Sequence, residues 1–453
     1  MIGVSGLELI KQISKTIAKD DTSNRKTIRF RGEGHMGKTL KYWQFIFHPV
    51  TLIFMLAFIL RAAPNIILEL REPGWHSTHI NEIEFYYDDV ARSLIAGKGF
   101  VHSVNPRNPD SIFNFTPGTP FHFVHPLYAW WLGVVYFFFG PNVLLAKILQ
   151  CLLDSFVCVL LYKVAKLMLN EISSLLASLL YALYPFSIYT CLVLYYQIPM
   201  NLAMCWMILS FNSKVTPLNG MWTGVAMAVS ALAKPVTLPF LFIFPAVKIF
   251  ENIKDRPMYK PVIKWSVSFL ITALFILTPW TVRNYLVFHR FIPIQDGGGE
   301  VFLQGSKEEY IDLDVDSLRK KYGSELTVSR DQMNRLAINN HIQHLKINPL
   351  DYIKFMGKKF LLTWFNTEGK TKNTKALMIQ IPFLFFAING FFYDYKNWIR
   401  RPNWYVIALI IYICAIQVVF FPLLRYTLVV MPFVLILSAS GMLITYNIIR
   451  EYV

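Results

Sequence analysis

Long apolar runs recur from residue 44 to the C-terminus, and they restrict the fold more than any other feature. Charged residues make up 16% of the 453 residues, whereas soluble domains carry about 25%. Only helices or closed barrels satisfy the backbone inside a bilayer. The runs are continuous and lack the alternation of a barrel strand, so the sequence predicts an all-α protein that crosses the membrane many times.

The spacing of these runs divides the chain. We expect a cytoplasmic, basic segment at 1–43 that is either a short amphipathic helix on the membrane or a disordered tail, and a transmembrane region at 44–279 that includes an outer loop at 64–126. A second outer-face region follows at 280–375, and the C-terminal transmembrane helices occupy 376–453. The runs predict about ten membrane helices. Lys and Arg gather before the first run, which predicts cytoplasmic N- and C-termini.

The formal net charge is +16. In a soluble protein this charge would suggest nucleic acid, but cytoplasmic loops of membrane proteins collect Lys and Arg, and no basic folded domain is visible. We therefore predict no nucleic-acid partner. The five cysteines all fall within apolar runs, where they indicate packing and not a disulfide or zinc framework.

The outer loop at 64–126 holds a dense group of acidic side chains. Glu84 and Asp88 are one helical turn apart, and Glu82 lies two residues before Glu84. Clustered carboxylates raise one another's pKa, which suits a general base. The alternative is a solvated amphipathic helix. Either way, the spacing from residue 85 to 96 predicts a helix that stops at Gly97.

Cations within apolar runs form a second group. Charges in membrane segments are costly and suggest function. Lys234 and Arg425 both lie in such runs. The alternative for both is a position near a helix end, from which the side chain reaches the interface, and this leaves Lys234 ambiguous. Arg425 is expected on the outer face, where a cation can bind the phosphate of a lipid carrier. Arg283 and Asn284 directly follow another apolar run and precede a glycine triplet.

His122 and His125 are three residues apart, a spacing that permits a metal site. The more ordinary interpretation is a pair of interfacial histidines. We predict neither a metal nor a cofactor.

Taken in order, these segments resemble the GT-C class of integral-membrane glycosyltransferases, in the branch of protein O-mannosyltransferases and lipid A aminoarabinose transferases. The resemblance covers roughly residues 45–445. It rests on the outer-loop pattern around Tyr87, Ala91, Arg92, Leu94, Gly97, Gly99 and Phe100, then on HPLYAWWLG, SALAKPVTLPFLFIFP, PWTVRNYLVFHRFIPI and LRYTLVVMPFVLIL.

The resemblance implies a GT-C-like bundle with two large outer-face loops in a bacterial-type plasma membrane. It implies inverting transfer of a sugar from a polyprenyl-phosphate-linked donor to a lipid, glycan or protein acceptor. Glu84 or Glu82 would be the catalytic base, and Arg425, Arg283 and Lys234 would bind the donor phosphate. Tyr87, Asp88, His125, Asn284 and Tyr426 would contact the substrate.

The sequence departs from the family at the acidic motif. Ile83 stands where the family has Asp, while Glu84 matches its Glu. A second acidic position of the family corresponds to Gln197, and the usual Arg-Pro corresponds to Lys234-Pro235. Either the base has moved to Glu82 or Glu84, or the protein has lost activity and only binds a lipid carrier. A transporter of lipid-linked sugars is a third hypothesis, but the polar groups concentrate in two loops and not through the membrane helices.

Overall fold

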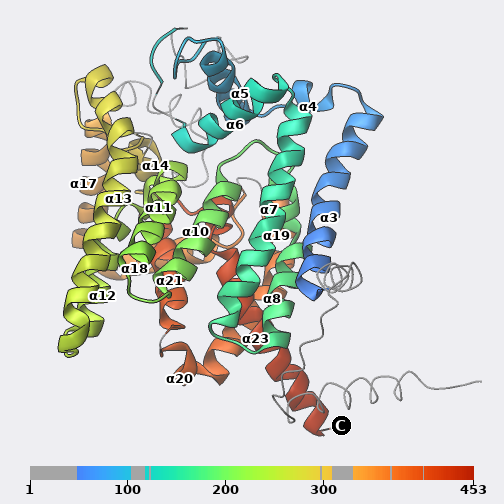
Figure 1. The fold of residues 1–453 in the computed structure, drawn as a ribbon, viewed down its shortest axis with the longest axis vertical. Helices are drawn as coiled ribbons and strands as arrows, with labels where there is room; N and C mark the ends of the chain where they lie inside the picture. Colours follow the sequence, from blue (N-terminus) through green and yellow to red (C-terminus); the bar gives the residue numbers. More distant parts are fainter. Residues whose placement is uncertain are drawn as a thin grey trace, which may run out of the picture. The chain divides into compact units, whose positions relative to one another are not determined.

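The structure is a computed structural model that describes residues 48–103, 118–121, 124–295, 298–308, 330–367, 370–400 and 402–452. The N-terminal segment predicted at 1–43 lies outside these residues. The elements from Pro49 onward form one compact unit, shown in Figure 1. Every named element within the described part is helical, and the β-contact there is an isolated bridge between Val101 and Pro120. The predicted all-α membrane class is confirmed.

The first half of the chain forms helices that are separated by short breaks. They are α3 (Pro49–Arg71), α4 (Trp75–Thr78), α5 (Glu82–Ile95), α6 (Pro126–Phe139), α7 (Val143–Lys166), α8 (Glu171–Leu183), α9 (Pro185–Thr190), α10 (Gln197–Phe211), α11 (Pro217–Ala233), the 3₁₀ turn η1 (Pro235–Thr237) and α12 (Phe240–Asn252). Figure 1 shows α4, α5 and the beginning of α6 at one end of the unit.

The second half begins with the longest helix and ends with a second group of membrane helices. Its elements are α13 (Arg256–Phe288), α14 (Gly298–Gln304), α17 (Arg330–Ile347), α18 (Pro349–Leu362), α19 (Lys370–Tyr393), α20 (Tyr395–Trp398), α21 (Trp404–Val419), α22 (Leu424–Thr427) and α23 (Met431–Tyr452). α13 continues to Phe288, past the expected end at 279, because Pro279 is accommodated inside the helix.

Six segments of the described residues are long and apolar enough to cross a membrane. They lie in α3, α7, η1 with α12, α13, α19 and α23, and four shorter apolar helices accompany them (α6, α8, α10 and α21). The predicted number of about ten membrane helices is therefore not confirmed. Prolines explain part of the shortening, because Pro185 starts α9 directly after α8 ends and Pro235 follows the end of α11.

Close helix packing depends on glycine in two places. Gly220 and Gly224, four residues apart on α11, lie against the α13 backbone at Trp265 and Phe269. Gly390 of α19 meets Gly441 of α23 in the same way. A side chain at these positions would overlap backbone atoms, so small residues are required where the helices approach, as is common between membrane helices.

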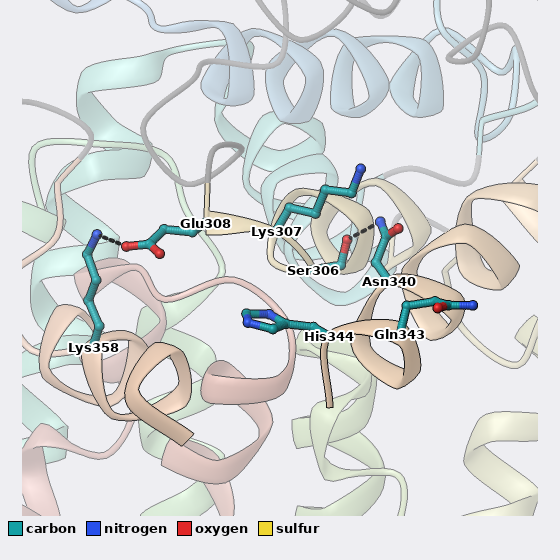
Figure 2. Close-up of a pocket in the computed structure, with 7 residues that line it drawn as sticks. All are labelled: Ser306, Lys307, Glu308, Asn340, Gln343, His344 and Lys358. Atoms are coloured by element: carbon teal, nitrogen blue, oxygen red, sulfur yellow. Dashed lines mark hydrogen bonds and ion pairs between the residues drawn. The ribbon is translucent and has the colours of Figure 1, made fainter. Parts of the chain in front are cut away.

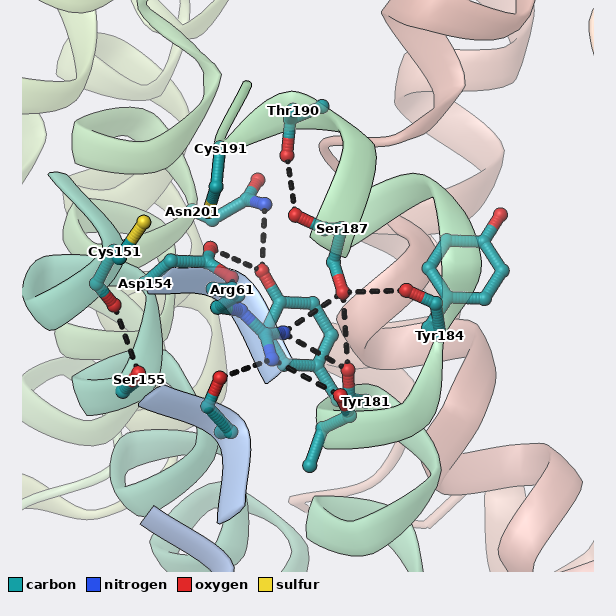
Figure 3. A network of polar contacts seen from close by, with 12 residues as sticks. Arg61, Cys151, Asp154, Ser155, Tyr181, Tyr184, Ser187, Thr190, Cys191 and Asn201 are labelled. Atoms are coloured by element: carbon teal, nitrogen blue, oxygen red, sulfur yellow. Dashed lines mark hydrogen bonds and ion pairs between the residues drawn. The ribbon is translucent and has the colours of Figure 1, made fainter. Parts of the chain in front are cut away.

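An ion pair is buried among the membrane helices (Figure 3). Arg61 of α3 donates from Nε to Asp154 of α7 at 2.5 Å, and both side chains are fully buried. Its other nitrogens donate to the carbonyl oxygens of Ala57, Tyr181 and Ala182 and to Ser187 Oγ. Arg61 thus caps the C-terminal end of α8, where the break before α9 leaves carbonyl groups without helical partners.

The Asp154 carboxylate also accepts a hydrogen bond from the Tyr181 hydroxyl at 2.7 Å. The pair was not anticipated from the sequence. Charged groups inside membrane helices are also expected of a transporter, but every N–H group of Arg61 is satisfied by a fixed protein group. The arrangement is that of a structural clamp between α3, α7 and α8.

We predict that Arg61→Leu or Asp154→Leu alone destabilises the protein by about 3–5 kcal/mol, because each leaves one buried charge unpaired. The double variant should be less destabilised than the sum of the two single variants. The apparent unfolding temperatures of the parent, the single variants and the double variant in detergent measure these differences. Lys166→Gln is the control, since it breaks a half-exposed pair with Glu171 that should contribute about 1 kcal/mol or less. Single variants that unfold at the parent temperature would contradict the clamp.

Candidate active site

The helix expected in the outer loop is α5, and its first turn is fixed by a capping box. The Asn81 side chain accepts a hydrogen bond from the Glu84 backbone N–H, and Glu84 Oε1 accepts from the Asn81 backbone N–H at 3.5 Å and from the Asn81 side-chain amide at 2.6 Å. These reciprocal bonds satisfy donors that a helix start leaves open. At the other end, Gly97 has a φ of 72°, which ends the helix.

Glu84 is buried, with 2% of its surface exposed. Its second oxygen, Oε2, accepts from the backbone N–H of Leu194 at 3.0 Å and forms an ion pair with Lys147 of α7 at 3.1 Å. The carboxylate therefore ties α5 to α7 and to the segment before α10. The side chain of Glu82, the other predicted base, lies outside the described part of the structure.

The segment from Leu194 to Gln197 connects this carboxylate to the predicted cations. Leu194 contacts Glu84, as described above. The Tyr196 hydroxyl accepts a hydrogen bond from Lys234 Nζ at 2.7 Å, and the Gln197 side chain donates to the backbone carbonyl of Arg425. Four consecutive residues thus link an outer-loop helix, the end of α11 and α22.

Aromatic side chains fill the space around this segment. The Tyr87 hydroxyl and His125 Nδ1 share a hydrogen bond of 2.7 Å, and the His125 ring lies 4.3 Å from the Tyr196 ring centre. Tyr195 packs against both Tyr87 and Tyr196. Burial, with a contribution from the nearby Lys234 charge, holds the pKa of His125 well below its usual range, so the imidazole is neutral.

Lys234 is the central cation of the cluster. Its Nζ lies 3.6 Å from the centre of the Tyr426 ring, a cation–π arrangement. Burial, and after it the positive charge of Arg425, holds the pKa of Lys234 well below its usual range. Both cations and Tyr426 are half-buried. In the part of the chain that the structure describes, no carboxylate lies within ion-pair distance of Lys234. We call Lys234, Arg425, Tyr196 and Tyr426 the cation–tyrosine site.

Three of the predicted site residues, Arg283, Asn284 and Asp88, are bound by partners outside the cation–tyrosine site. Arg283 donates to the carbonyl oxygens of Phe100 and Phe121, and Asn284 donates to those of Ile292 and Ile294. Both side chains therefore hold chain segments in place. Asp88 accepts from Tyr136 of α6 at 2.6 Å and pairs with Arg92 one turn further along α5.

Asp89 was not among the predicted site residues. It is buried and accepts hydrogen bonds from His102, from the Ser103 backbone N–H at 2.9 Å and from Ser103 Oγ. Burial by itself would raise the pKa of Asp89, but the hydrogen bonds from His102 and Ser103 outweigh burial and lower it. This carboxylate fastens the chain that follows α5 back onto the helix.

A polar cavity of about 780 Å³ lies near the end of α14 (Figure 2). The Asn340 amide donates to Ser306 Oγ at 2.9 Å, and Lys358 pairs with Glu308 at 2.6 Å. The remaining lining residues are Lys307, Gln343 and His344. Phe355, Phe421 and Leu423 form a small apolar cluster against which Tyr426 packs. The Phe355 ring centre lies 5.5 Å from that of the cavity residue His344, so this cluster contacts both the cavity and the cation–tyrosine site.

Within the described ranges, no three or more His, Cys, Asp or Glu side chains gather in a way that suits a metal ion. His122, which the sequence paired with His125, lies outside those ranges.

Sequence reasoning overlooked Lys147 and Tyr196. Lys147 had a usable signal, since it is a lysine within the apolar run at 143–168. Tyr196 had none, because tyrosine is common at membrane interfaces.

We predict that Asp89→Asn lowers the unfolding temperature, because the amide loses one acceptor in a buried network. The folded-state pKa of Asp89 is lower than its unfolded value of about 3.9. The stabilising contribution of the ionised Asp89 carboxylate to the free energy of unfolding should therefore be complete above the unfolded-state pKa. It should disappear as the pH falls through the folded-state pKa. The difference in unfolding temperature between parent and variant, followed over pH, measures this. Asp351→Asn, at an exposed position, is the control; a difference that persists unchanged in acid would contradict the prediction.

No protein-family model matches the sequence, and no curated protein matches it either. Solved structures do match. One is the archaeal oligosaccharyltransferase AglB from Archaeoglobus fulgidus in complex with an inhibitory peptide and a dolichol-phosphate, at 14% identity and a TM-score of 0.55 over 91% of this chain and 51% of that chain. A second structure of the Archaeoglobus fulgidus oligosaccharyltransferase, tethered to an acceptor peptide, matches at 13% identity and a TM-score of 0.56 over 91% of this chain and 50% of that chain.

ArnT from Cupriavidus metallidurans bound to undecaprenyl phosphate aligns with 90% of this chain and 77% of its own, at 12% identity and a TM-score of 0.37. The chain spans about half the length of the oligosaccharyltransferase chains that it matches. Those oligosaccharyltransferases are membrane glycosyltransferases of the GT-C class. The protein therefore has the GT-C membrane fold.

Proposed function

We propose that this protein is a membrane glycosyltransferase that takes its sugar from a polyprenyl-phosphate-linked donor. The acceptor is a lipid, glycan or protein on the outer face of a bacterial-type plasma membrane, and both termini lie in the cytoplasm. The observation that carries the proposal is Lys234, a half-buried cation without a carboxylate partner among the described residues, next to Arg425.

Two neighbouring cations favour binding of an anion, because an anion relieves their mutual repulsion. Phosphate suits the site, since a guanidinium and an ammonium both donate charge-assisted hydrogen bonds to phosphate oxygens. The Tyr426 hydroxyl lies 3.4 Å from the Arg425 guanidinium and offers a further donor. The same charges would stabilise the lipid phosphate as it leaves with the electron pair of the broken bond. The dolichol-phosphate in the AglB complex supports a lipid phosphate as ligand.

In the proposed reaction, the acceptor hydroxyl attacks the anomeric carbon and forms a new C–O bond with inversion. The bond from that carbon to the phosphate oxygen breaks, and a carboxylate in the first turn of α5 takes the hydroxyl proton. Both oxygens of Glu84 are already engaged. We therefore assign proton transfer to Glu82, and to Glu84 the task of holding α5 against α7 and Leu194.

The polar cavity of Figure 2 is the place that we propose for the acceptor. Its hydroxyl, amide, imidazole and ammonium groups suit a polar, hydroxyl-rich acceptor better than an apolar one. The apolar cluster shared with Tyr426 supports both sites from one side.

A second candidate function is binding of a lipid carrier without transfer. The engagement of Glu84 with Lys147 and the presence of Ile83 at the family's Asp position favour this alternative. The two functions agree on the phosphate site and differ only in the need for a base.

We predict that Lys234→Met and Arg425→Met each weaken binding of a polyprenyl phosphate by about tenfold or more, since a hydrogen bond to a charged group contributes about 1.5–3 kcal/mol. Native mass spectrometry with undecaprenyl phosphate measures this. Lys254→Met, at an exposed cytoplasmic position, is the matched control. Arg283→Met should retain binding, because Arg283 is occupied by carbonyl oxygens. Unchanged affinity in both cation variants would overturn the proposed phosphate site.

We predict that Glu82→Gln abolishes transfer while carrier binding persists, because the amide cannot accept the proton. Glu84→Gln, unlike Glu82→Gln, should lower the unfolding temperature, because it leaves Lys147 without its carboxylate. Transfer from a polyprenyl-phosphate sugar and unfolding are measured on the same preparations. An active Glu82→Gln variant would refute the base assignment, and a parent protein that binds the carrier but never transfers would favour the binding function.

A further inference from the structure

The α17–α18 hairpin has an apolar outer surface. On α17, Ile338, Ile342 and Leu345 share one side of the helix, and each has more than two fifths of its surface exposed. The opposite side of α17 carries Asn340, Gln343 and His344, which line the polar cavity. An ordinary surface helix turns its polar side to water and its apolar side to the protein. In α17 the polar side lines the cavity and the apolar side faces outward.

α18 repeats the pattern. Its inner side presents Phe355 and Lys359, both buried, while its outer side presents Leu350 at 73% exposure, Ile353 at 63% and Leu361 at 61%. Large apolar side chains at this density do not normally face water, because soluble surfaces rarely expose contiguous apolar patches of this kind.

The hairpin is fixed to the membrane helices. Lys359 donates from Nζ to the carbonyl oxygens of Gly305, Val419 and Phe420, which ties α18 to the ends of α14 and α21. α18 packs on α21, and α14 packs on α17. In Figure 1, α17 and α18 lie within the height that the membrane helix α13 covers.

The lipid-facing surface of α13 has the same character. Ile271, Leu274 and Phe275 of that helix are exposed at 64%, 47% and 79%. The apolar side of the hairpin therefore has the same exposed apolar character as a membrane-helix surface that acyl chains must cover. Lysines at 346 and 354 are exposed on the hairpin, where long side chains can reach the headgroups.

From this shared apolar exposure we infer that the α17–α18 hairpin is embedded in the bilayer through Ile338, Ile342, Leu345, Leu350, Ile353 and Leu361, with the polar cavity on its opposite, protein-facing side. The inference differs from the sequence expectation, which placed residues 280–375 in a polar outer region. It does not depend on the proposed catalytic function.

Single cysteines test the inference in the full-length protein reconstituted in vesicles. All five native cysteines are buried, so an added exposed cysteine can be labelled selectively with a fluorophore. Ile342→Cys and Ile353→Cys are the test positions. Gln343→Cys is the matched control on the cavity side, and Leu274→Cys is the reference for a lipid-facing position. An unfolding temperature equal to that of the parent shows that each variant is folded.

Quenching by nitroxide-labelled lipid and by aqueous iodide then places each label. We expect the labels at 342 and 353 to lose as much fluorescence to the lipid quencher as the label at 274, and much less to iodide than the label at 343. Strong iodide quenching at 342 and 353 would overturn the inference, since the hairpin would face water. Protection from both quenchers would overturn it too, because the surface would then be covered by another protein or a second copy.

Discussion

Buried charge is the constraint on which this structure depends, because a charge inside a membrane protein is stable only when fixed partners replace its water. Three pairings among the described residues show how the chain meets this requirement. Arg61 is paired with Asp154, Lys147 with Glu84, and Lys359 with three carbonyl oxygens. Each pairing joins segments that are distant in sequence, such as Arg61 and Asp154, which are 93 residues apart. The same contacts that neutralise charge thus hold the helices in register.

Lys234 does not follow this pattern, and the difference identifies the candidate site. Its described partners are the Tyr196 hydroxyl and the Tyr426 ring, which orient an ammonium group without neutralising it. Arg425 adds a second positive charge nearby. Such an arrangement is costly unless an anion completes it. A lipid carrier brings its phosphate to this depth together with a prenyl chain that the apolar helices can accommodate.

Much of the fold could be predicted from the sequence, since continuous apolar runs permit little besides membrane helices. The number of membrane-spanning helices could not be predicted from the runs alone, because proline breaks and helix lengths are not visible in them. The break at Pro185 shortens α8, and the expected count of about ten crossings is not confirmed. At the site, the sequence named Tyr87, His125, Lys234, Arg425 and Tyr426, which the structure brings into one cluster, although their contact with substrate stays a prediction. Local spacing cannot reveal that Lys147 meets Glu84 or that Arg283 holds backbone carbonyls, because those partners lie on distant segments.

The most direct test of the central claim is an experimental structure of the protein with a bound polyprenyl phosphate. We expect the phosphate to lie within hydrogen-bond distance of Lys234 Nζ and the Arg425 guanidinium, with the prenyl chain running toward the lipid. A phosphate bound elsewhere, for example against Arg283 or at an exposed lysine such as Lys254, with Lys234 still facing only tyrosines, would contradict the proposed site.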